Sequence, residues 1–307
     1  KIIGEHGGRE LSGKLKASAR RILEMAELFE EEEPDIALSF SSPEMARVAF
    51  GLGIPHICVN DSPHAEAVAR LTLPLSDMLL TSKFIPRTAW VKYGIRKDRI
   101  IQYRALDPWA WLKDFVPNDN VLKTLGLDAS RPIITLRTEE SFAAYLLGKA
   151  LKESILSPTI DCLLNRARDV QVVIIPRYES QIETFKESFG GRAVVCSSVV
   201  DGPSLLSFTS IFVGAGGTMT AEAALLGVPT FSCYPSEPYF IERYLMRIGL
   251  VKRETDPQRL ARKVLKTLEK IESEKIRQSM KAREIVKNFE DPAEVIAKAV
   301  NVFRQKE

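Results

Sequence analysis

The stretch from Gly214 to Gly227 reads GAGGTMTAEAALLG and has the composition best suited to chemistry in this chain. It places three glycines in four positions between an apolar, strand-like run and a segment of helical composition. A helix N-terminus presents unpaired N–H groups and the positive end of the helix dipole, and glycines let a bulky anion approach the backbone closely. The pattern favours a diphosphate-binding turn, and a purely structural tight turn is the alternative. Its spacing matches neither GxGxxG nor a Walker A loop.

Glu222 strengthens the diphosphate interpretation. With Thr218 as the helix N-cap, the capping-box position would be residue 221, which is alanine. Glu222 would then lie one turn into the helix among small apolar residues. A carboxylate just behind a phosphate-binding turn can accept hydrogen bonds from both hydroxyls of a ribose. The alternative is an exposed helix glutamate.

Two arginines stand where apolar, strand-like runs end. Arg137 ends PIITLR, and Arg177 follows VQVVIIP. Ligands of α/β proteins bind at the carboxyl ends of parallel strands, and a guanidinium group suits phosphate oxygens. Both arginines are therefore candidate ligand contacts, and ion pairing with Glu139 or Glu179 is the alternative role.

A second group of candidates follows the run PHICV in the N-terminal half, within NDSPHAEAVAR. Asp61, His64 and Glu66 could do acid–base work or bind an acceptor, because histidine and carboxylate side chains can each take a proton from an attacking hydroxyl. The alternative is that Asp61 or Ser62 caps a helix and that Glu66 is a solvated surface residue.

Composition restricts the class of protein. The chain has 307 residues, 45% of them hydrophobic and 27% charged, which is typical of a globular protein with one large or two medium domains. A net charge of +3 is too small and too evenly mixed to indicate a nucleic-acid partner. The four cysteines are widely spaced, without a CxxC motif, so we expect buried reduced thiols in a cytoplasmic protein.

Nine apolar runs of strand length alternate with helix-period segments, which indicates parallel strands buried on both faces and an α/β fold. The runs occupy residues 35–40, 55–60, 78–82, 99–103, 132–137, 170–176, 192–198, 210–214 and 229–234. Residues 104–131 interrupt this rhythm and predict a linker between two Rossmann-like domains. The expected domains are 1–115 and 116–290, followed by a C-terminal helix at 291–307, and the tail from 253 onward is expected to be helical.

The segment DGPSLLSFTSIFVGAGGTMTAEAALLGVPTFSCYP resembles the donor-nucleotide motif of GT-B proteins. These include the glycosyltransferase that makes peptidoglycan lipid intermediates and the UDP-N-acetylglucosamine 2-epimerases. HGGRELSGKL and PDIALSFSSPEMARVAFGLGIPHICVNDSPHAEAVARLTLPLSDMLLTS, in the first half, agree with this resemblance. Over almost its whole length the chain is most similar to a largely archaeal domain family of unknown function in the same superfamily. In that family the run KIIGEHGG comes about two strands into the protein, so we expect a first β-α-β segment before Lys1.

The resemblance implies a GT-B-like fold of two Rossmann-like domains, with a nucleotide sugar, expected to be UDP-linked, bound in the cleft between them. It also implies roles for individual residues. Gly216, Gly217 and Thr218 would contact the diphosphate, and Glu222 would contact the ribose. Ser197 and Ser198 would hold the nucleobase, and Glu237 would contact the donor sugar.

The reaction most consistent with these residues is glycosyl transfer to an unidentified acceptor, for which a lipid-linked molecule is one candidate. The 2-epimerases carry a histidine in a THRxEN-like pattern, whereas residues 135–141 read TLRTEES and contain none. No DxD motif is present, so we expect neither a metal nor another cofactor. An epimerase-type isomerase and a non-catalytic sugar-nucleotide-binding protein stay open as alternatives.

Overall fold

The computed structural model describes residues 1–8, 10–139 and 154–304. The contacts among them divide the chain into two compact units. Unit 1 comprises residues 1–107 and 290–304, and unit 2 comprises residues 108–139 and 154–289. The chain first passes from one unit to the other between Asp107 and Pro108, inside the stretch that the sequence predicted as a linker.

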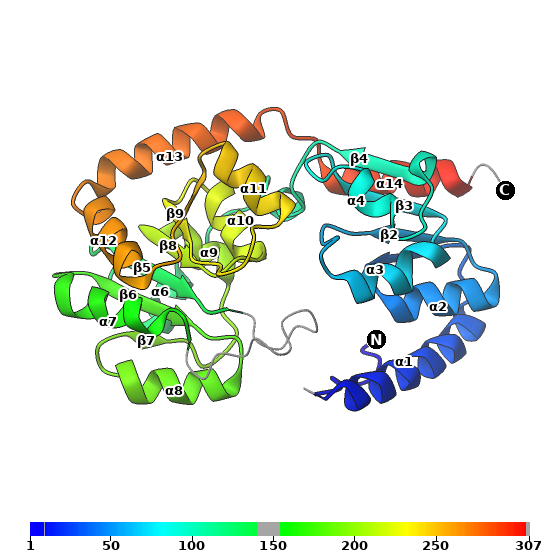
Figure 1. The fold of residues 1–307 in the computed structure, drawn as a ribbon, viewed down its shortest axis with the longest axis horizontal. Helices are drawn as coiled ribbons and strands as arrows, with labels where there is room; N and C mark the ends of the chain where they lie inside the picture. Colours follow the sequence, from blue (N-terminus) through cyan, green and yellow to red (C-terminus); the bar gives the residue numbers. More distant parts are fainter. Residues whose placement is uncertain (9, 140–153, 305–307) are drawn as a thin grey trace. The chain divides into compact units, whose positions relative to one another are not determined.

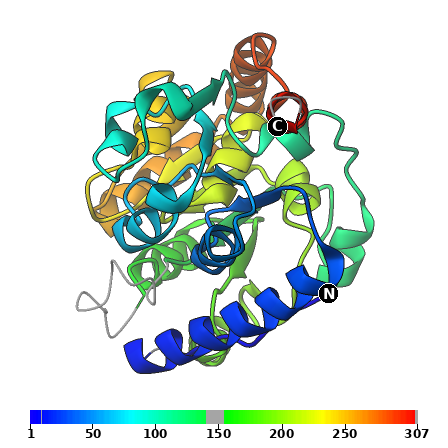
Figure 2. The ribbon, with the colours of Figure 1, turned by 90° about the vertical axis from the view of Figure 1, so that its right-hand side faces the viewer.

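Unit 1 is built on a parallel sheet with the strand order β1-β2-β3-β4 (Figure 1). The strands are β1 (Ala37–Phe40), β2 (His56–Val59), β3 (Met78–Ser82) and β4 (Ile100–Tyr103). The helices are α1 (Leu11–Glu32), α2 (Pro43–Leu52), α3 (Glu66–Thr72), α4 (Thr88–Val91) and α14 (Pro292–Arg304), with 3-10 turns at Leu73–Leu75 and Lys97–Arg99. Ser42 caps α2 by accepting a hydrogen bond from the Met45 N–H, and Gly53 ends it with φ of 71°. Helix α1 packs beside α2 (Figure 2).

Unit 2 contains a six-stranded parallel sheet with the order β10-β9-β8-β5-β6-β7. The strands are β5 (Ile133–Arg137), β6 (Gln171–Ile175), β7 (Val194–Val195), β8 (Ile211–Gly214), β9 (Thr230–Ser232) and β10 (Val251–Arg253). The helices are α5 (Trp109–Leu112), α6 (Asn120–Leu125), α7 (Ser157–Arg166), α8 (Glu179–Phe189), α9 (Gly202–Phe208), α10 (Thr218–Leu225), α11 (Phe240–Arg247), α12 (Pro257–Leu268) and α13 (Ile271–Val286).

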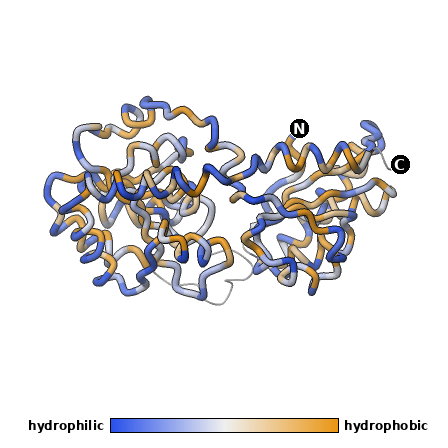
Figure 3. The backbone as a smooth tube through the Cα atoms, turned by 90° about the horizontal axis from the view of Figure 1, so that it is seen from above, coloured by the Kyte–Doolittle hydropathy of each residue, from blue (hydrophilic) through white to orange (hydrophobic). Residues whose placement is uncertain are grey.

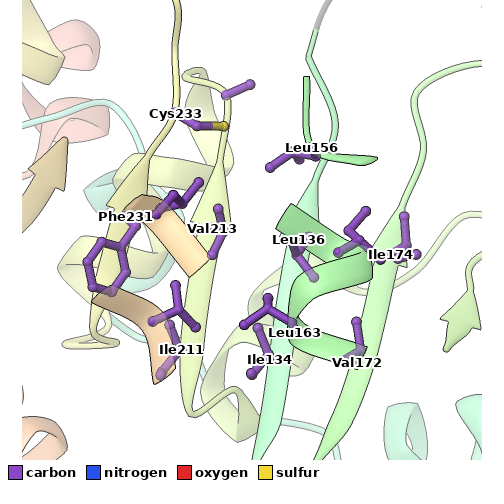
Figure 4. Close-up of a cluster of buried hydrophobic side chains, with 14 of the residues drawn as sticks. Ile134, Leu136, Leu156, Leu163, Val172, Ile174, Ile211, Val213, Phe231 and Cys233 are labelled. Carbon is purple, nitrogen blue, oxygen red and sulfur yellow. The ribbon is translucent and has the colours of Figure 1, made fainter. Parts of the chain in front are cut away.

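Helices cover both faces of this sheet because neighbouring residues of each strand point to opposite faces. On one face, Leu136 and its neighbours on β6, β8 and β9 pack against α7, α8 and α12 (Figure 4). On the other face, Ile133 packs with residues of α6 and α9, and Phe212 with residues of α9 and α10. The continuous apolar runs of the sequence therefore correspond to strands buried on both faces. Figure 3 shows these hydrophobic segments inside each unit.

All nine strand predictions are confirmed, and the structure adds β10 (Val251–Arg253), whose sequence VKR holds a single apolar residue. The predicted linker is not featureless, since residues 104–131 contain α5 and α6. Each of these helices has six or fewer residues, too few to show a helical period in the sequence.

The four cysteines are free and buried, as the sequence indicated. None of the helices in the described part of the chain combines the length and apolar character that crossing a membrane requires.

Candidate functional site

The topology of the unit 2 sheet defines a switch point between β5 and β8. From these neighbouring strands the chain order runs outward in opposite directions, through β6 to β7 and through β9 to β10. Arg137, the last residue of β5, lies opposite Gly214, the last residue of β8. Open α/β sheets bind ligands just beyond the carboxyl ends of their strands at such a point. The glycine turn therefore follows β8 at the position where this class of fold binds ligands.

The turn leaves the start of α10 open. Gly216 and Gly217 have φ of 84° and 87°, backbone angles that residues with a side chain rarely adopt. Gly217 is the N-cap of α10, and among the described residues no side chain makes a cap hydrogen bond to the helix. Helix α10 begins at Thr218, as the sequence predicted, so its N-cap is the residue before Thr218 and not Thr218 itself. Gly217 and Thr218 are exposed, so the first N–H groups of α10 face solvent.

Gly214 lets α10 pack tightly on the strand that precedes it. A Cβ atom at this position would lie 2.6 Å from Oγ1 of Thr220 and 2.7 Å from the Phe212 ring. A Cβ at Gly216 would lie 3.4 Å from the Tyr234 ring, so this ring packs against the turn. The glycines therefore serve both the close packing of strand and helix and the open conformation of the turn.

Arg177 lies beside the turn. Its Nη2 is 3.2 Å from the position that a Cβ of Gly217 would occupy. Its Nε donates to the carbonyl oxygen of Thr138 at 3.0 Å, and its backbone N–H donates to Oε1 of Gln181. Arg137 is directed elsewhere, since its Nη1 donates to the carbonyl oxygens of Ile175 and Pro176, the latter at 2.6 Å. Of the two candidate arginines, the structure brings the Arg177 guanidinium to the turn.

Glu222 is buried, with 9% of its surface exposed, and its Oε1 accepts a hydrogen bond from Nε1 of Trp111 at 2.9 Å. The alternative of an exposed helix glutamate is therefore wrong. Burial raises the pKa of Glu222 above its usual value, and the bond from Trp111 opposes that rise. Trp111 belongs to α5, in the stretch that the sequence predicted as a linker. The one sequence signal for its contact with Glu222 was the hydrogen-bond donor that every tryptophan carries, its indole N–H.

The remaining unit 2 candidates lie on loops at the same carboxyl edge. Ser197 and Ser198 follow β7 and are exposed. Glu237 is exposed in the loop between β9 and α11. Arg253 fixes this loop by donating to the carbonyl oxygens of Tyr234 and Ser236, both at 3.1 Å. The backbone of the loop is thus held while Glu237 stays accessible.

In unit 1, Asp61 lies in the turn after β2. Its Oδ1 accepts a hydrogen bond from the Ser62 hydroxyl at 2.6 Å, and burial raises its pKa. Helix α3 begins only at Glu66, and its N-cap, Ala65, makes no side-chain cap. The alternative that Asp61 or Ser62 caps this helix is therefore wrong. Glu66 forms an exposed ion pair with Arg70 at 2.7 Å instead of joining Asp61.

Burial lowers the pKa of His64 to about 4, which leaves its imidazole neutral at physiological pH. The structure also adds a carboxyl group that sequence reasoning missed. Asp107, buried just beyond β4, accepts a hydrogen bond from the Tyr103 hydroxyl at 2.5 Å. Burial and the charge of Asp61 raise the pKa of Asp107 to about 7. Among the described residues, no three histidine, cysteine or acidic side chains are grouped to hold a metal ion.

Two units, each a parallel sheet with helices, and a helical C-terminal region define a GT-B-like α/β protein, which confirms the predicted fold class. The structure is similar to a putative UDP-N-acetylglucosamine 2-epimerase from Listeria monocytogenes (TM-score 0.72, 17% identity, 95% of this chain and 80% of that chain). It is also similar to the UDP-GlcNAc 2-epimerase from Neisseria meningitidis bound to UDP-GlcNAc (TM-score 0.70, 15% identity, 93% and 81%).

The family model described as "Protein of unknown function (DUF354)" matches residues 1–304, and the chain belongs to this family. A relative, the uncharacterized protein MJ0665 of Methanocaldococcus jannaschii, is 37% identical over 251 residues, which cover 80% of this chain and 70% of that protein. The resemblance noted in the sequence is thus confirmed at the level of the family.

Proposed function

We propose that this chain is a GT-B-type glycosyltransferase that binds a UDP-linked sugar at the β5–β8 switch point and transfers the sugar to an acceptor. The observation that carries the proposal is the exposed, uncapped start of α10, with the Arg177 guanidinium beside it. A helix N-terminus and an arginine are together well suited to a diphosphate, because both present N–H donors and positive charge. Glu222, one turn further, would accept hydrogen bonds from the ribose.

The same groups would serve transfer as well as binding. When the bond between the sugar and the diphosphate breaks, negative charge grows on the leaving oxygen. Donors already fixed around that oxygen stabilise this charge without reorganisation. We therefore propose that the reaction proceeds without a metal ion. The UDP-GlcNAc bound in the N. meningitidis structure supports uracil as the nucleobase of the donor.

For the base that takes the acceptor proton we propose Asp61. His64, with its pKa at about 4, is a weak proton acceptor at neutral pH. Asp61 is the better candidate because its pKa is raised, and a base whose pKa lies closer to neutrality accepts protons more effectively.

Calorimetric titration with UDP, compared with the other nucleoside diphosphates and with UDP-N-acetylglucosamine, tests the donor site. We expect saturable binding of UDP and a loss of about 10-fold in affinity in Arg177→Gln, equivalent to about 1.4 kcal/mol. Arg96→Gln is the matched control, because Arg96 loses only an exposed ion pair with Asp98 in unit 1. If no nucleotide binds the wild-type chain, both the donor site and the transferase proposal fail.

The second candidate function is isomerisation of the 2-epimerase type, which the similarity to the two epimerases favours. Epimerisation at C2 replaces the C2 hydrogen with one from solvent, whereas transfer leaves it in place. Incubation of the protein with UDP-N-acetylglucosamine in D2O, without any acceptor, separates the two functions. Deuterium at C2 or a second sugar epimer would support the isomerase, and binding without either reaction leaves transfer or a purely binding role.

A further inference from the structure

Contacts that join the carboxyl ends of β5 and β6 hold Arg177 beside the glycine turn. These strands are neighbours, and their last residues, Arg137 and Ile175, are register partners. Thr138 follows β5, and its backbone N–H donates to the carbonyl oxygen of Ile175 at 3.3 Å. The main chain therefore brings Thr138 next to the segment after β6 that carries Arg177.

The side chain of Gln181 ties these two strand ends together. Its Oε1 accepts a hydrogen bond from the Arg177 backbone N–H at 2.9 Å and another from the Thr138 hydroxyl at 2.9 Å. Because a backbone N–H can only donate, the amide oxygen of Gln181 and not its amide nitrogen must face it. One oxygen atom thus connects the backbone of Arg177 to the side chain of Thr138.

Gln181 belongs to the first turn of α8, a helix that is packed on the sheet of unit 2. Phe185 and Phe189 of α8 are buried in the same cluster as Leu136 of β5 and Ile174 of β6, and Figure 4 labels the two strand residues. A side chain on a packed element positions its partners more precisely than a side chain on a loop. Gln181 is therefore a fixed point for the segment between β6 and α8.

The guanidinium of Arg177 is oriented by the same group of residues. Its Nε donates to the carbonyl oxygen of Thr138 at 3.0 Å, and because the guanidinium is planar, this bond restricts the direction of both Nη atoms. Nη2 lies 3.2 Å from the position that a Cβ of Gly217 would occupy. Arg137 holds the backbone just before Arg177, since its Nη1 donates to the carbonyl oxygen of Pro176 at 2.6 Å. A long side chain that is fixed in advance loses less freedom when it binds an anion.

We propose that Gln181 and Thr138 are positioning residues that act through Arg177 and make the donor site select a nucleoside diphosphate over a nucleoside monophosphate. This inference rests on the proposed function. The start of α10 offers N–H donors to one phosphate group. The guanidinium beside it, already oriented, offers a second set of donors to the next phosphate of the same nucleotide. A monophosphate has no group for this second set of donors.

Calorimetric titration of Gln181→Leu with UDP, and with uridine monophosphate (UMP) in competition with UDP, tests the proposal. Leucine removes the acceptor and keeps a side chain of similar size. We expect UDP affinity to fall by about 3- to 10-fold, the effect of losing hydrogen bonds that orient Arg177, and UMP affinity to stay at the wild-type value. In the Arg177→Gln background the same substitution should cost no further UDP affinity.

Equal losses for UDP and UMP in Gln181→Leu, or an undiminished loss of UDP affinity in the Arg177→Gln background, would overturn the proposal. Either result is expected of a glutamine that only stabilises α8, because such a residue has no reason to act through Arg177. Gln171→Leu is the matched control. Gln171 begins β6, and its side chain makes hydrogen bonds with the backbone of Asp128 at the amino end of the strand, so both affinities should equal those of the wild type.

Thr138→Val is the second variant in case Gln181→Leu does not fold. Valine fits the buried site of Thr138, removes the hydroxyl that donates to Gln181, and leaves the carbonyl oxygen that accepts from Arg177. We expect a loss of about 2- to 5-fold for UDP and none for UMP. A loss shared by both nucleotides would contradict the positioning role.

Titration of the wild type separates this inference from the proposed function. A wild type that binds UDP no more tightly than UMP, or as tightly as Gln181→Leu and Thr138→Val do, defeats this inference alone and leaves the donor site in place. A wild type that binds no nucleotide defeats the proposed function, and this inference fails with it.

Discussion

Replacing Gly217 with valine is expected to weaken UDP binding by about 100-fold or more, equivalent to at least about 2.7 kcal/mol. Gly217 has φ of 87° and ψ of −178°, a region that is essentially restricted to glycine. A Cβ there would lie 3.2 Å from Nη2 of Arg177, and the two methyl groups of valine extend further. The substitution therefore displaces the guanidinium and covers the N–H groups that would hold the diphosphate. Calorimetric titration with UDP measures the loss.

Gly126→Val is the matched control for backbone strain. Gly126 lies in the same unit, ends α6 with φ of 64°, and has no atom within 4 Å of its ideal Cβ position. We expect this variant to lose stability through strain and to keep its affinity for UDP. Wild-type affinity in a folded Gly217→Val protein, with folding checked by circular dichroism, would show that the turn does not bind the nucleotide.

The turn and the sheets could be predicted because their determinants are local. Val/Ile/Leu runs without alternation indicate strands covered on both faces, and the structure has such strands at all nine positions. The glycines of the turn are likewise required by backbone conformation and by the close approach of Phe212 and Thr220. A pattern of neighbouring residues is sufficient for both conclusions.

The partners of the candidate residues could not be predicted in the same way. Glu222 accepts a hydrogen bond from Trp111, which lies 111 positions earlier in the chain. Trp111 belongs to a helix of only four residues. Asp107 lies beyond β4, and burial, together with the charge of Asp61 from the turn after β2, raises its pKa. These effects depend on how the chain folds and not on neighbouring residues in the sequence. Sequence proximity was also misleading, because Glu66 lies near Asp61 in the chain but forms a surface ion pair with Arg70.

A double-mutant cycle on Trp111 and Glu222 has the second large expected effect. Glu222→Gln should weaken UDP binding by about 10- to 100-fold, because each hydrogen bond to a charged group contributes about 1.5–3 kcal/mol. Trp111→Phe removes the indole N–H that orients the carboxylate and should cost about 3- to 10-fold, or about 0.7–1.4 kcal/mol. The double variant should lose less than the sum of both, because Trp111 acts through Glu222.

Trp109→Phe is the control for the cycle. Trp109 belongs to the same short helix, and its ring packs edge-on against Phe289 at 6.2 Å between centroids. The UDP affinity of Trp109→Phe shows whether any disturbance of α5 weakens binding. Equal losses in Trp109→Phe and Trp111→Phe would attribute the effect to packing of the helix and not to the bond with Glu222.

The dependence of UDP affinity on pH gives the cycle a second readout. Ribose hydroxyls donate hydrogen bonds, so the ionised form of Glu222 is the one that binds, and affinity should fall as the pH drops through its raised pKa. The bond from Trp111 lowers that pKa, so in Trp111→Phe the fall should begin at higher pH. In Glu222→Gln this fall should be absent. An unchanged pH dependence in Trp111→Phe would show that Trp111 does not control the charge of Glu222, and the indole would then be a packing residue alone.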